Sequence, residues 1–437
     1  MSELTISSTN WLAISLQNGA AMVFNLNDTQ QWQYLKPEII PNDKPKEATV
    51  TKQKTQDNDD DNTSDLNRNL IKFTPDGQKL AINGQNKQIY IYIPSNNDKT
   101  YWKLQRIITV IKRASAFDLT NEFLLIADKS GDVYKTDLSN NTNLILTPDD
   151  CMMGHLSMLL DIAFIRTNDN QPFILTADRD EKIRLSHYPN AYNIQGYCLG
   201  HTEFVSHVKL IDQNHILSAS GDGTLRLWHL PDCVELNVFD SKIFTSSAKQ
   251  IFYEQSSNID DNQSLSINHS IWKMDITSTT SDVFIALSIY ASRTHSIYLT
   301  TLSNLKNSNN EQRKITFNST HGTIIDYCFS SKNPTDLYIL FDSNTLLKVN
   351  IISILSCDKN EYFEENNKSI STILAREEFN LINNINSLEI IFKQLFKSRG
   401  DPGDSSYYKR KNQRIEEQEE KRKKKQSKKQ VPVNENV

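Results

Sequence analysis

The amino-acid sequence predicts an all-β fold, a seven-bladed β-propeller. One segment, residues 216–230 (ILSASGDGTLRLWHL), alternates small and apolar residues on both sides of a glycine-rich turn, as a β-hairpin does. An earlier segment matches it in register, and 42 residues separate the two turn aspartates, Asp180 and Asp222. This spacing is typical of propeller repeats. Seven such units close a ring without exposed sheet edges.

Seven strand–turn–strand units follow this rhythm along the chain. In order they span residues 11–26, 80–93, 123–138, 153–188, 199–230, 283–302 and 337–352. The third, fourth and fifth units carry the pattern most clearly, and the other four depend on the rhythm and on ring closure. An open solenoid would need polar capping repeats at its ends, and none stands out here.

The fifth unit resembles the WD repeat, whose blade is a four-stranded antiparallel sheet. It begins with Gly-His and ends with SASGDGTLRLW. In that family a His, a strand Ser or Thr, the turn Asp and the final Trp form a hydrogen-bonded chain. The resemblance assigns these positions to His201, Ser218, Asp222 and Trp228. One unit earlier, His155 and Asp180 stand in the same register, and we interpret these residues as structural.

Two long segments and a basic tail lie outside the rhythm. We expect the propeller to span residues 1–352, with a disordered insertion at 41–68 that is polar and acidic. Residues 353–400 form a C-terminal extension, in which apolar residues from Leu388 to Phe396 recur at helical spacing and predict an amphipathic helix. Residues 401–437 form a charged tail, helical or disordered, with eleven Lys and Arg against four Glu at 409–430. The net charge of −5 therefore conceals an acidic body with a basic tail.

Composition indicates an intracellular protein. The five cysteines are scattered, without the spacing of a disulfide framework or a metal site. The chain begins without the basic and apolar pattern of a secretory signal. No apolar run approaches the roughly 20 residues that a membrane-spanning helix needs.

The sequence contains none of the common catalytic motifs. We find no phosphate-binding loop, HExxH pair, nucleophile elbow or cysteine pair, and therefore predict no catalytic residue, no metal site and no cofactor. The sequence therefore predicts that the propeller acts as a binding platform. Its most distinctive part is the cluster of Arg179, Lys182 and Arg184, where Ser186 occupies the usual Trp position. Ordinary solvated charges on a strand are the alternative interpretation of this cluster.

Four blocks resemble one particular WD-repeat family more closely than they resemble the general repeat. They are ADKSGDVY (127–134), GHLSMLLDI (154–162), TADRDEKIRLSHYP (176–189) and LGHTEFVSHV (199–208). They are similar to the non-catalytic subunit of the eukaryotic tRNA (guanine-N(7)-)-methyltransferase, in its fungal form. The resemblance is dense over residues 112–230.

This resemblance implies a heterodimer with a separate catalytic subunit, which binds S-adenosylmethionine and methylates a guanine in the tRNA variable loop. In that family, the basic residue of the DEKIR block pairs with an acidic residue of the catalytic subunit, and that position here is Arg184. An Arg can bind a carboxylate with two parallel hydrogen bonds. The other expected contacts fall into two groups. Neighbouring partner contacts are Arg179, Asp180, Lys182 and Tyr188, and partner or tRNA contacts are Lys112, Arg113 and Lys129.

The resemblance also implies a nuclear protein, and the basic runs at 409–411 and 421–425 suit nuclear import. The basic tail has an equally plain interpretation as a solvated extension. A general WD-repeat adaptor, such as a substrate adaptor of a ubiquitin ligase, is the alternative function. Adaptors of that kind usually carry a recruitment element beside the propeller, and the short N-terminal segment offers none.

Overall fold

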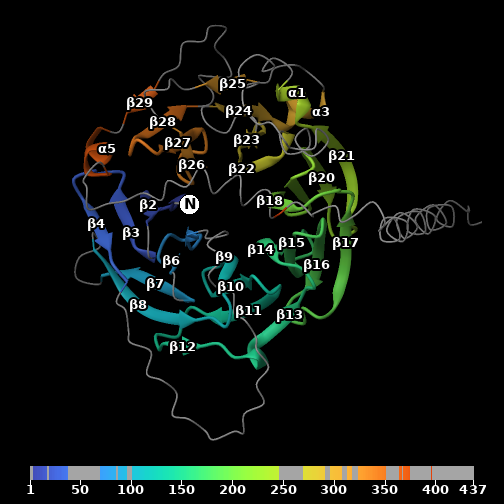
Figure 1. Ribbon diagram of the computed structural model, residues 1–437, viewed down its shortest axis with the longest axis horizontal. Coiled ribbons are helices and arrows are strands. Elements are labelled where there is room, and N and C mark those ends of the chain that lie inside the picture. The colour runs from blue at the N-terminus through green and yellow to red at the C-terminus, as the bar shows by residue number, and fades with distance from the viewer. Residues whose placement is uncertain are drawn as a thin grey trace, which may run out of the picture. The chain divides into compact units, whose positions relative to one another are not determined.

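The computed structural model is a seven-bladed β-propeller (Figure 1). It describes residues 3–16, 19–37, 69–84, 87–95, 101–245, 269–290, 296–307, 313–316, 323–350, 364–366, 368–374 and 395. Blades 1 and 2 contain β1 (Leu4–Ile6), β2 (Trp11–Ser15), β3 (Ala21–Asn25), β4 (Trp32–Leu35), β5 (Ile71–Phe73), β6 (Leu80–Asn83), β7 (Gln88–Pro94) and β8 (Trp102–Thr109).

The remaining blades follow the same four-stranded plan. Blades 3 and 4 contain β9 (Ala114–Leu119), β10 (Phe123–Asp128), β11 (Asp132–Asp137), β13 (Cys151–Gly154), β14 (Leu159–Arg166), β15 (Pro172–Asp178), β16 (Lys182–His187) and β17 (Ile194–Leu199). Blades 5 to 7 contain β18 (Val205–Asp212), β19 (His215–Ser220), β20 (Thr224–His229), β21 (Val234–Asp240), β22 (Ile271–Ser278), β23 (Val283–Ile289), β24 (Ser296–Thr301), β25 (Arg313–Thr316), β26 (Ile324–Phe329), β27 (Asp336–Phe341), β28 (Leu346–Asn350) and β29 (Glu364–Asn366). The elements outside this plan are β12 (Leu144–Ile145), η2 (Pro148–Asp150), α1 (Lys242–Thr245), α3 (Leu302–Lys306) and α5 (Lys368–Leu374).

The position of a strand within its blade explains its residue pattern. The second strand of a blade is covered by a neighbouring blade on each face, so β10 (FLLIAD) and β27 (DLYILF) are buried along their whole length and mostly apolar. The outermost strand lies at the rim, and in β21 exposed residues alternate with half-buried ones and with the buried Phe239. Each of the seven predicted units contains the second and third strands of one blade, and the fourth and fifth units also contain the first strand. The predicted fold class is confirmed.

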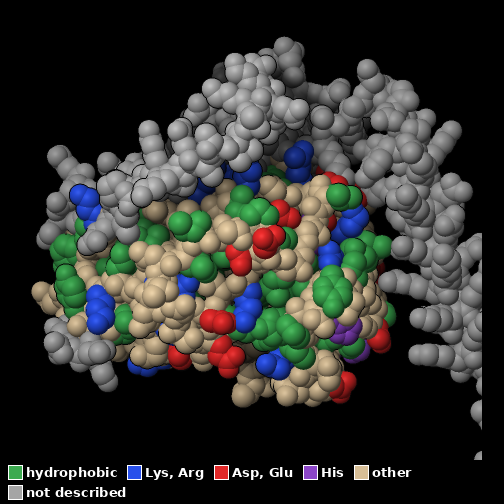
Figure 2. Space-filling view, turned by 90° about the horizontal axis from the view of Figure 1, so that it is seen from below, with side chains coloured by type: hydrophobic (Ala, Val, Ile, Leu, Met, Phe, Trp, Pro, Cys, Tyr) green, Lys and Arg blue, Asp and Glu red, His purple; other side chains and the backbone are tan. Residues whose placement is uncertain are grey.

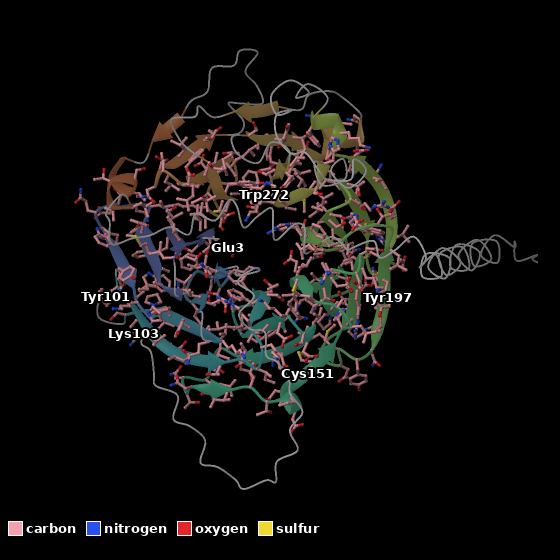
Figure 3. The ribbon with its side chains drawn as sticks, viewed as in Figure 1. Glu3, Tyr101, Lys103, Cys151, Tyr197 and Trp272 are labelled. Atoms are coloured by element: carbon pink, nitrogen blue, oxygen red, sulfur yellow. The ribbon has the colours of Figure 1, made fainter. Side chains whose placement is uncertain are left out.

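The first strand of each blade lies at the centre of the ring. These strands contact one another in the cyclic order β1, β5, β9, β14, β18, β22, β26 and back to β1. They surround a central cavity of about 330 Å³, lined by residues of all seven strands. Glu3 and Trp272 lie towards this centre, whereas Tyr101, Lys103 and Tyr197 lie at the rim (Figure 3).

Aspartates on the inner strands join neighbouring blades. In four places a carboxylate accepts a hydrogen bond from a backbone N–H of the next blade. The pairs are Asp118 with Phe164 at 2.8 Å, Asp161 with Val208 at 2.9 Å, Asp275 with Phe329 at 2.9 Å and Asp326 with Leu4 at 2.7 Å. Each bond satisfies a main-chain donor at the contact between two blades, and Asp326 is itself buried. The last pair closes the ring between blades 7 and 1.

Lysines of the preceding blade contact three of these aspartates. The pairs are Lys72 with Asp118, Lys209 with Asp275 and Lys273 with Asp326. Burial alone would lower the pKa of Lys273, but nearby carboxylates, Asp326 first among them, raise it above its ordinary value. Lys273 therefore stays charged beside the carboxylate that closes the ring.

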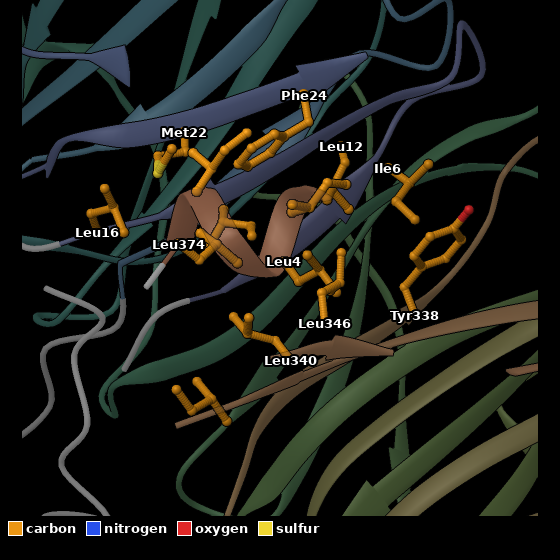
Figure 4. Packing of buried hydrophobic residues seen from close by; sticks show 14 of the residues in the cluster. Leu4, Ile6, Leu12, Leu16, Met22, Phe24, Tyr338, Leu340, Leu346 and Leu374 are labelled. Carbon is orange, nitrogen blue, oxygen red and sulfur yellow. The ribbon is translucent and has the colours of Figure 1, made fainter. Parts of the chain in front are cut away.

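An apolar cluster and a short helix cover the same closure. Leu12, Phe24 and other residues of blade 1 pack with Leu340 and Leu346 of blade 7 (Figure 4). The helix α5 adds Ile370 and Leu374, both fully buried, to this cluster. The Ser371 hydroxyl accepts a hydrogen bond from the backbone N–H of Leu346 at 3.1 Å. Segments near the two ends of the propeller sequence therefore share one core.

A second connection joins blades 2 and 3 at the rim. Between β11 and β13 the chain adds the two-residue strand β12 in parallel to the outer edge of β8. Arg106 of β8 lies beneath this connection, 2% exposed, and its guanidinium donates to the carbonyls of Asp137 and Asn140. The outer strand of blade 2 is therefore covered by a segment of blade 3.

The predicted domain boundary at residue 352 is wrong. The fourth strand of blade 7, β29, pairs with β28 and lies beyond this boundary, and α5 packs on the same blade. A short strand with the sequence EEN has no apolar alternation, so no residue pattern predicts it. The predicted insertion at 41–68, the helix around Leu388–Phe396 and the tail at 401–437 lie outside the described residues, except for Leu395, which is buried.

The ring closure yields a first prediction. In Asp326→Ala, Leu4 N–H loses its acceptor and Lys273 loses its nearest carboxylate, so we expect the free energy of unfolding to fall by about 3 kcal/mol. Urea unfolding followed by tryptophan fluorescence measures this change. The matched control is Asp232→Ala, at an exposed loop position, which should leave the midpoint unchanged. Equal midpoints for the two variants would contradict a closing role for Asp326.

Candidate partner-binding face

Blade 5 contains the complete hydrogen-bonded chain that the WD resemblance implied. The His201 ring lies 3.0 Å from Asp222 Oδ2 through Nδ1 and 2.7 Å from Ser218 Oγ through Nε2. Trp228 Nε1 donates to the same Ser218 Oγ at 2.8 Å. Ser218 and Trp228 are fully buried. These hydrogen bonds connect the four residues in the order that the resemblance implied, and they hold the turn that joins β19 to β20.

This chain also shifts the titration of Asp222. Burial alone would raise the pKa of the carboxyl, but the hydrogen bond and electrostatic attraction to His201 outweigh it, together with donors from Thr224 and Thr202. The pKa of Asp222 therefore lies well below its ordinary value. The ionised form belongs to the folded state.

Blade 4 keeps part of this chain with different residues. His155 Nε2 lies 3.0 Å from Thr176 Oγ1, the equivalent of Ser218. The carboxylate near His155 Nδ1 is Asp178, at 3.8 Å, whereas the sequence register assigned this position to Asp180. The assignment to Asp180 is wrong because Asp178 Oδ1 also accepts the backbone N–H of Lys182 at 2.9 Å, so the turn closes on the earlier aspartate.

Arg184 occupies the space that a Trp fills in the general repeat. Ser186 stands at the Trp position, is fully buried, and accepts a hydrogen bond from Arg184 Nε at 2.9 Å. The other guanidinium nitrogens donate to the carbonyls of Gly154 at 3.1 Å and Ala191 at 3.0 Å. Burial lowers the pKa of this guanidinium from its ordinary value. A small residue at position 186 thus lets Arg184 turn inward and connect the outer strand of blade 3 to blade 4.

The equivalent arginine of blade 5 behaves differently. Arg226 pairs with the carboxylate of Glu235 on the same blade, because Trp228 already fills the interior. Direct contact of Arg184 with a partner stays a prediction. Arg184 is only 7% exposed, however, and its three nitrogens each donate to the protein itself.

The turn between β15 and β16 brings three other predicted residues together. Lys182 is exposed, while Arg179 and Asp180 are half-buried beside it. The backbone N–H of Arg179 donates to the carbonyl of Met158 at 3.0 Å, which holds the turn against the segment entering blade 4. These residues therefore lie at one end of the blade.

The basic residues of blade 3 lie on the same face of the ring. Lys129 N–H donates to the carbonyl of Arg113 at 3.1 Å, so Lys112, Arg113 and Lys129 meet at the corresponding turn. The neighbouring Gly131 has φ +96° and sits against His155, whose backbone N–H donates to the Gly131 carbonyl at 2.9 Å. A Cβ here would meet the His155 and Ser157 carbonyl oxygens at 2.7 and 2.6 Å. Gly131 thus allows the turn of blade 3 to touch the entry to blade 4.

We define the blade 3–4 face as the set of predicted residues that these turns bring together. Its members are Lys112, Arg113, Lys129, Arg179, Asp180 and Lys182. Five of the six are basic. Figure 2 shows acidic, basic and apolar side chains mixed over the side of the ring that carries blades 2 and 3. The blade 3–4 face is therefore defined by the hydrogen bonds of its turns and not by a charged patch in this view.

Tyr188 does not belong to this face. It follows the far end of β16, where its ring stacks on Phe123 at 5.3 Å and meets Phe164 edge-on at 5.2 Å. Lys135 lies 5.2 Å from the centre of the Phe123 ring. Because β16 is extended, about 20 Å separates its two ends. A partner bound at the blade 3–4 face would have to extend to the opposite end of the blade to contact Tyr188.

Two residues that shape the face were not among the predicted ones. Asp128 of blade 3 accepts the N–H groups of Ser130 and Asp132 through Oδ1, as Asp178 accepts that of Lys182. A shared Ala-Asp-basic triplet, at 127–129 and 177–179, was the available sequence signal. If the aspartate of each triplet accepts the hydrogen bonds of the turn, the blade 4 turn is assigned to Asp178 in place of Asp180.

No group of three or more His, Cys, Asp or Glu side chains among the described residues is arranged to hold a metal ion, and the four cysteines among these residues are free. The helices in these ranges are all too short or too polar to cross a membrane.

The lowered pKa of Asp222 gives a pH-dependent prediction. An aspartate with a folded pKa below its unfolded value of about 4 stabilises the native state above that pH, and the contribution is lost as the pH falls towards the folded pKa. Asp222→Asn should lower the free energy of unfolding by about 1–2 kcal/mol at pH 7. The difference in this free energy between the variant and the wild-type chain should be smaller at pH 3. Thermal unfolding at both pH values measures it, and a constant difference would refute the linkage.

A second prediction concerns Arg184. Arg184→Met keeps the length of the side chain but leaves Ser186 and the carbonyls of Gly154 and Ala191 without their donor. We expect the free energy of unfolding to fall by about 2–4 kcal/mol. Arg226→Met removes the equivalent arginine, which bonds a half-exposed Glu, and should cost under about 1 kcal/mol. Equal losses in the two variants would show that the inward position of Arg184 has no special energetic role.

Comparisons with known proteins agree with the resemblance found in the sequence. Residues 147–346 match a family model described as "tRNA methyltransferase TRM82 WD40 domain". A chain in the crystal structure of the mitotic checkpoint complex superposes with a TM-score of 0.52 over 80% of this chain and 90% of that chain. At 12% identity this similarity supports the propeller fold alone.

Two curated relatives also share sequence with this chain. The "tRNA (guanine-N(7)-)-methyltransferase non-catalytic subunit wdr4" of Danio rerio is 34% identical over 252 residues, 55% of this chain and 54% of that protein. The WDR4 protein of Homo sapiens, with the same description, is 40% identical over 163 residues, 36% of each chain. The chain thus spans about half the length of the first relative and about a third of the second. The resemblance is confirmed: over part of its length the chain is similar to the non-catalytic WD-repeat subunits of tRNA (guanine-N(7)-)-methyltransferase.

Proposed function

We propose that this chain is the non-catalytic subunit of a heterodimeric tRNA methyltransferase that forms N(7)-methylguanosine in the tRNA variable loop. The observation that carries the proposal is the match of residues 147–346 to the family model, together with the similarity of the chain to proteins named as that subunit. In this proposal a separate catalytic subunit binds S-adenosylmethionine and performs the methyl transfer. The chain described here stabilises and orients that subunit.

The blade 3–4 face is the proposed contact with the catalytic subunit. Its turns are fixed by backbone hydrogen bonds and by buried aspartates, so its side chains project from a preorganised surface. Lys182 is exposed at its centre, and Arg179 lies beside it. Exposed cations of this kind recognise an acidic partner surface and accelerate association with it.

Arg184 supports this face from below in the same proposal. Its hydrogen bonds to Gly154 and Ala191 connect the two blades that carry the face. A partner carboxylate that reaches Arg184 would do so at the edge of a guanidinium already oriented by three acceptors, which favours a defined geometry. Loss of Arg184 is therefore expected to weaken the complex through the shape of the face as well as through its charge.

Three further expectations belong to the same proposal. Lys112, Arg113 and Lys129 lie beside the proposed contact, where basic side chains would meet tRNA phosphates or the partner. Tyr188 is a candidate only for a partner that extends around the blade. The nuclear location implied by the family resemblance is proposed with them, since its basic signals lie outside the described residues.

Charge reversal at Lys182 tests the proposal. Because Lys182 is exposed, Lys182→Glu should preserve the fold while it places a like charge against an acidic partner. We expect at least a tenfold loss of the co-purified methyltransferase subunit and a matching loss of N(7)-methylguanosine in tRNA. The matched control is Lys103→Glu, on the rim of blade 2 (Figure 3), which should retain both.

The same purification separates the alternative function. Recovery of ubiquitin-ligase subunits with the wild-type chain, and of no methyltransferase, would contradict the proposal and favour a general adaptor. Recovery of the methyltransferase at wild-type level with Lys182→Glu would not contradict the proposed complex, but it would exclude Lys182 as a contact residue.

A further inference from the structure

The outer strand of blade 5 is an unusually apolar sheet edge. In the described residues β21 pairs with β20 on one side and with no strand on the other. Val234, Leu236 and Val238 are 43%, 45% and 44% exposed. Exposed apolar residues repeated along a free edge form a surface on which another strand can pair.

Other outer strands of the ring differ from β21. The edge of β8 is covered by β12. The sequences of β25 (RKIT) and β29 (EEN) contain consecutive charged residues, and charge on an edge opposes further pairing. The outer strands β4, β13 and β17 lack lysine, arginine and proline, as β21 does. In the described residues, however, β21 is the outer strand that exposes three large apolar side chains.

One residue of β21 has no partner residue on β20, and its side chain is available for contact with an incoming strand. Trp228 pairs with Glu235 and Leu227 with Asn237, so Leu236 stands outside the ladder as a bulge. From Asn237 to Asp240 the register is regular, and the outward main-chain groups of this stretch are suitably arranged for one further strand. The strand β12 on β8 shows that an outer edge of this propeller accepts a fifth strand.

The charge at one end of β21 indicates the chemistry of its occupant. Asp232 is exposed just before the strand. Asp240 at the other end already pairs with Lys242 at 3.7 Å, and Glu235 between them pairs with Arg226 of the same blade. A partner strand with a basic residue at the end that lies against Asp232 would complement this carboxylate.

We propose that β21 binds an extended segment of a partner protein by strand addition. The segment is apolar at alternate positions and has a lysine or arginine at the end that lies against Asp232. Main-chain hydrogen bonds to the edge of β21 would supply the affinity, and Val234, Leu236 and Val238 would select apolar side chains. This site is separate from the blade 3–4 face and does not depend on the proposed function.

A labelled peptide tests the proposal on the full-length chain. The probe is a fluorescein-labelled nonapeptide that alternates valine and threonine between terminal lysines, and its binding is followed by fluorescence anisotropy. We expect saturable binding that weakens at least tenfold in Leu236→Lys, because the new charge repels the terminal lysines and removes an apolar contact. Leu156→Lys is the matched control, since Leu156 is fully exposed in a loop, and it should bind as the wild type does.

Two further measurements decide between strand addition and other modes of binding. Amide hydrogen exchange at residues 237–240 should slow when the peptide is bound. A peptide with glutamate in place of both lysines should bind at least fivefold more weakly. Equal affinity of the wild-type chain and Leu236→Lys, or unchanged exchange in β21, would overturn the proposal. Melting temperatures equal to the wild type establish that each variant is folded.

Discussion

The aspartates of the inner strands that bind the next blade are the constraint on which this propeller depends. A ring of separate sheets holds together only if each blade binds the next, and apolar packing between blades does not fix their vertical alignment. A carboxylate that accepts one particular backbone N–H does so, because displacement by a single residue would break the bond. The closing contact from Asp326 to Leu4 joins residues 322 positions apart. Blades 1 and 7 are each complete from their own segments, so closure depends on this contact and on the core that α5 covers.

A fixed ring makes local departures from the repeat informative. Blade 5 has the complete chain of His201, Ser218, Asp222 and Trp228 and needs no other support. Blade 4 lacks the Trp, and the vacancy is filled by the guanidinium of Arg184, whose hydrogen bonds connect it to blade 3. One substitution thus changes an arginine from a rim residue to an internal support. The basic turns of blades 3 and 4 are consequently held together as one surface.

The sequence predicted those features that depend on local pattern. The hairpin units and the residues of the complete blade 5 chain follow from alternation and turn chemistry over short distances. Features that depend on contacts between residues distant in the sequence could not be predicted from local pattern. The side chain of Arg184 could be placed only once the space beside Ser186 was known, and Asp178 replaced Asp180 because of a backbone hydrogen bond within the turn. The strand β29 and the helix α5 have little pattern of their own and are placed by the blade on which they pack.

The account joins a rigid ring to a basic face on blades 3 and 4 and assigns that face to a catalytic methyltransferase subunit. Amide hydrogen exchange of the chain, alone and with that subunit, tests this claim most directly. The account predicts slower exchange in the turns at 128–132 and 178–184, with little change in β8 at the rim of blade 2. Protection confined to other blades, with unchanged exchange in both turns, would contradict it.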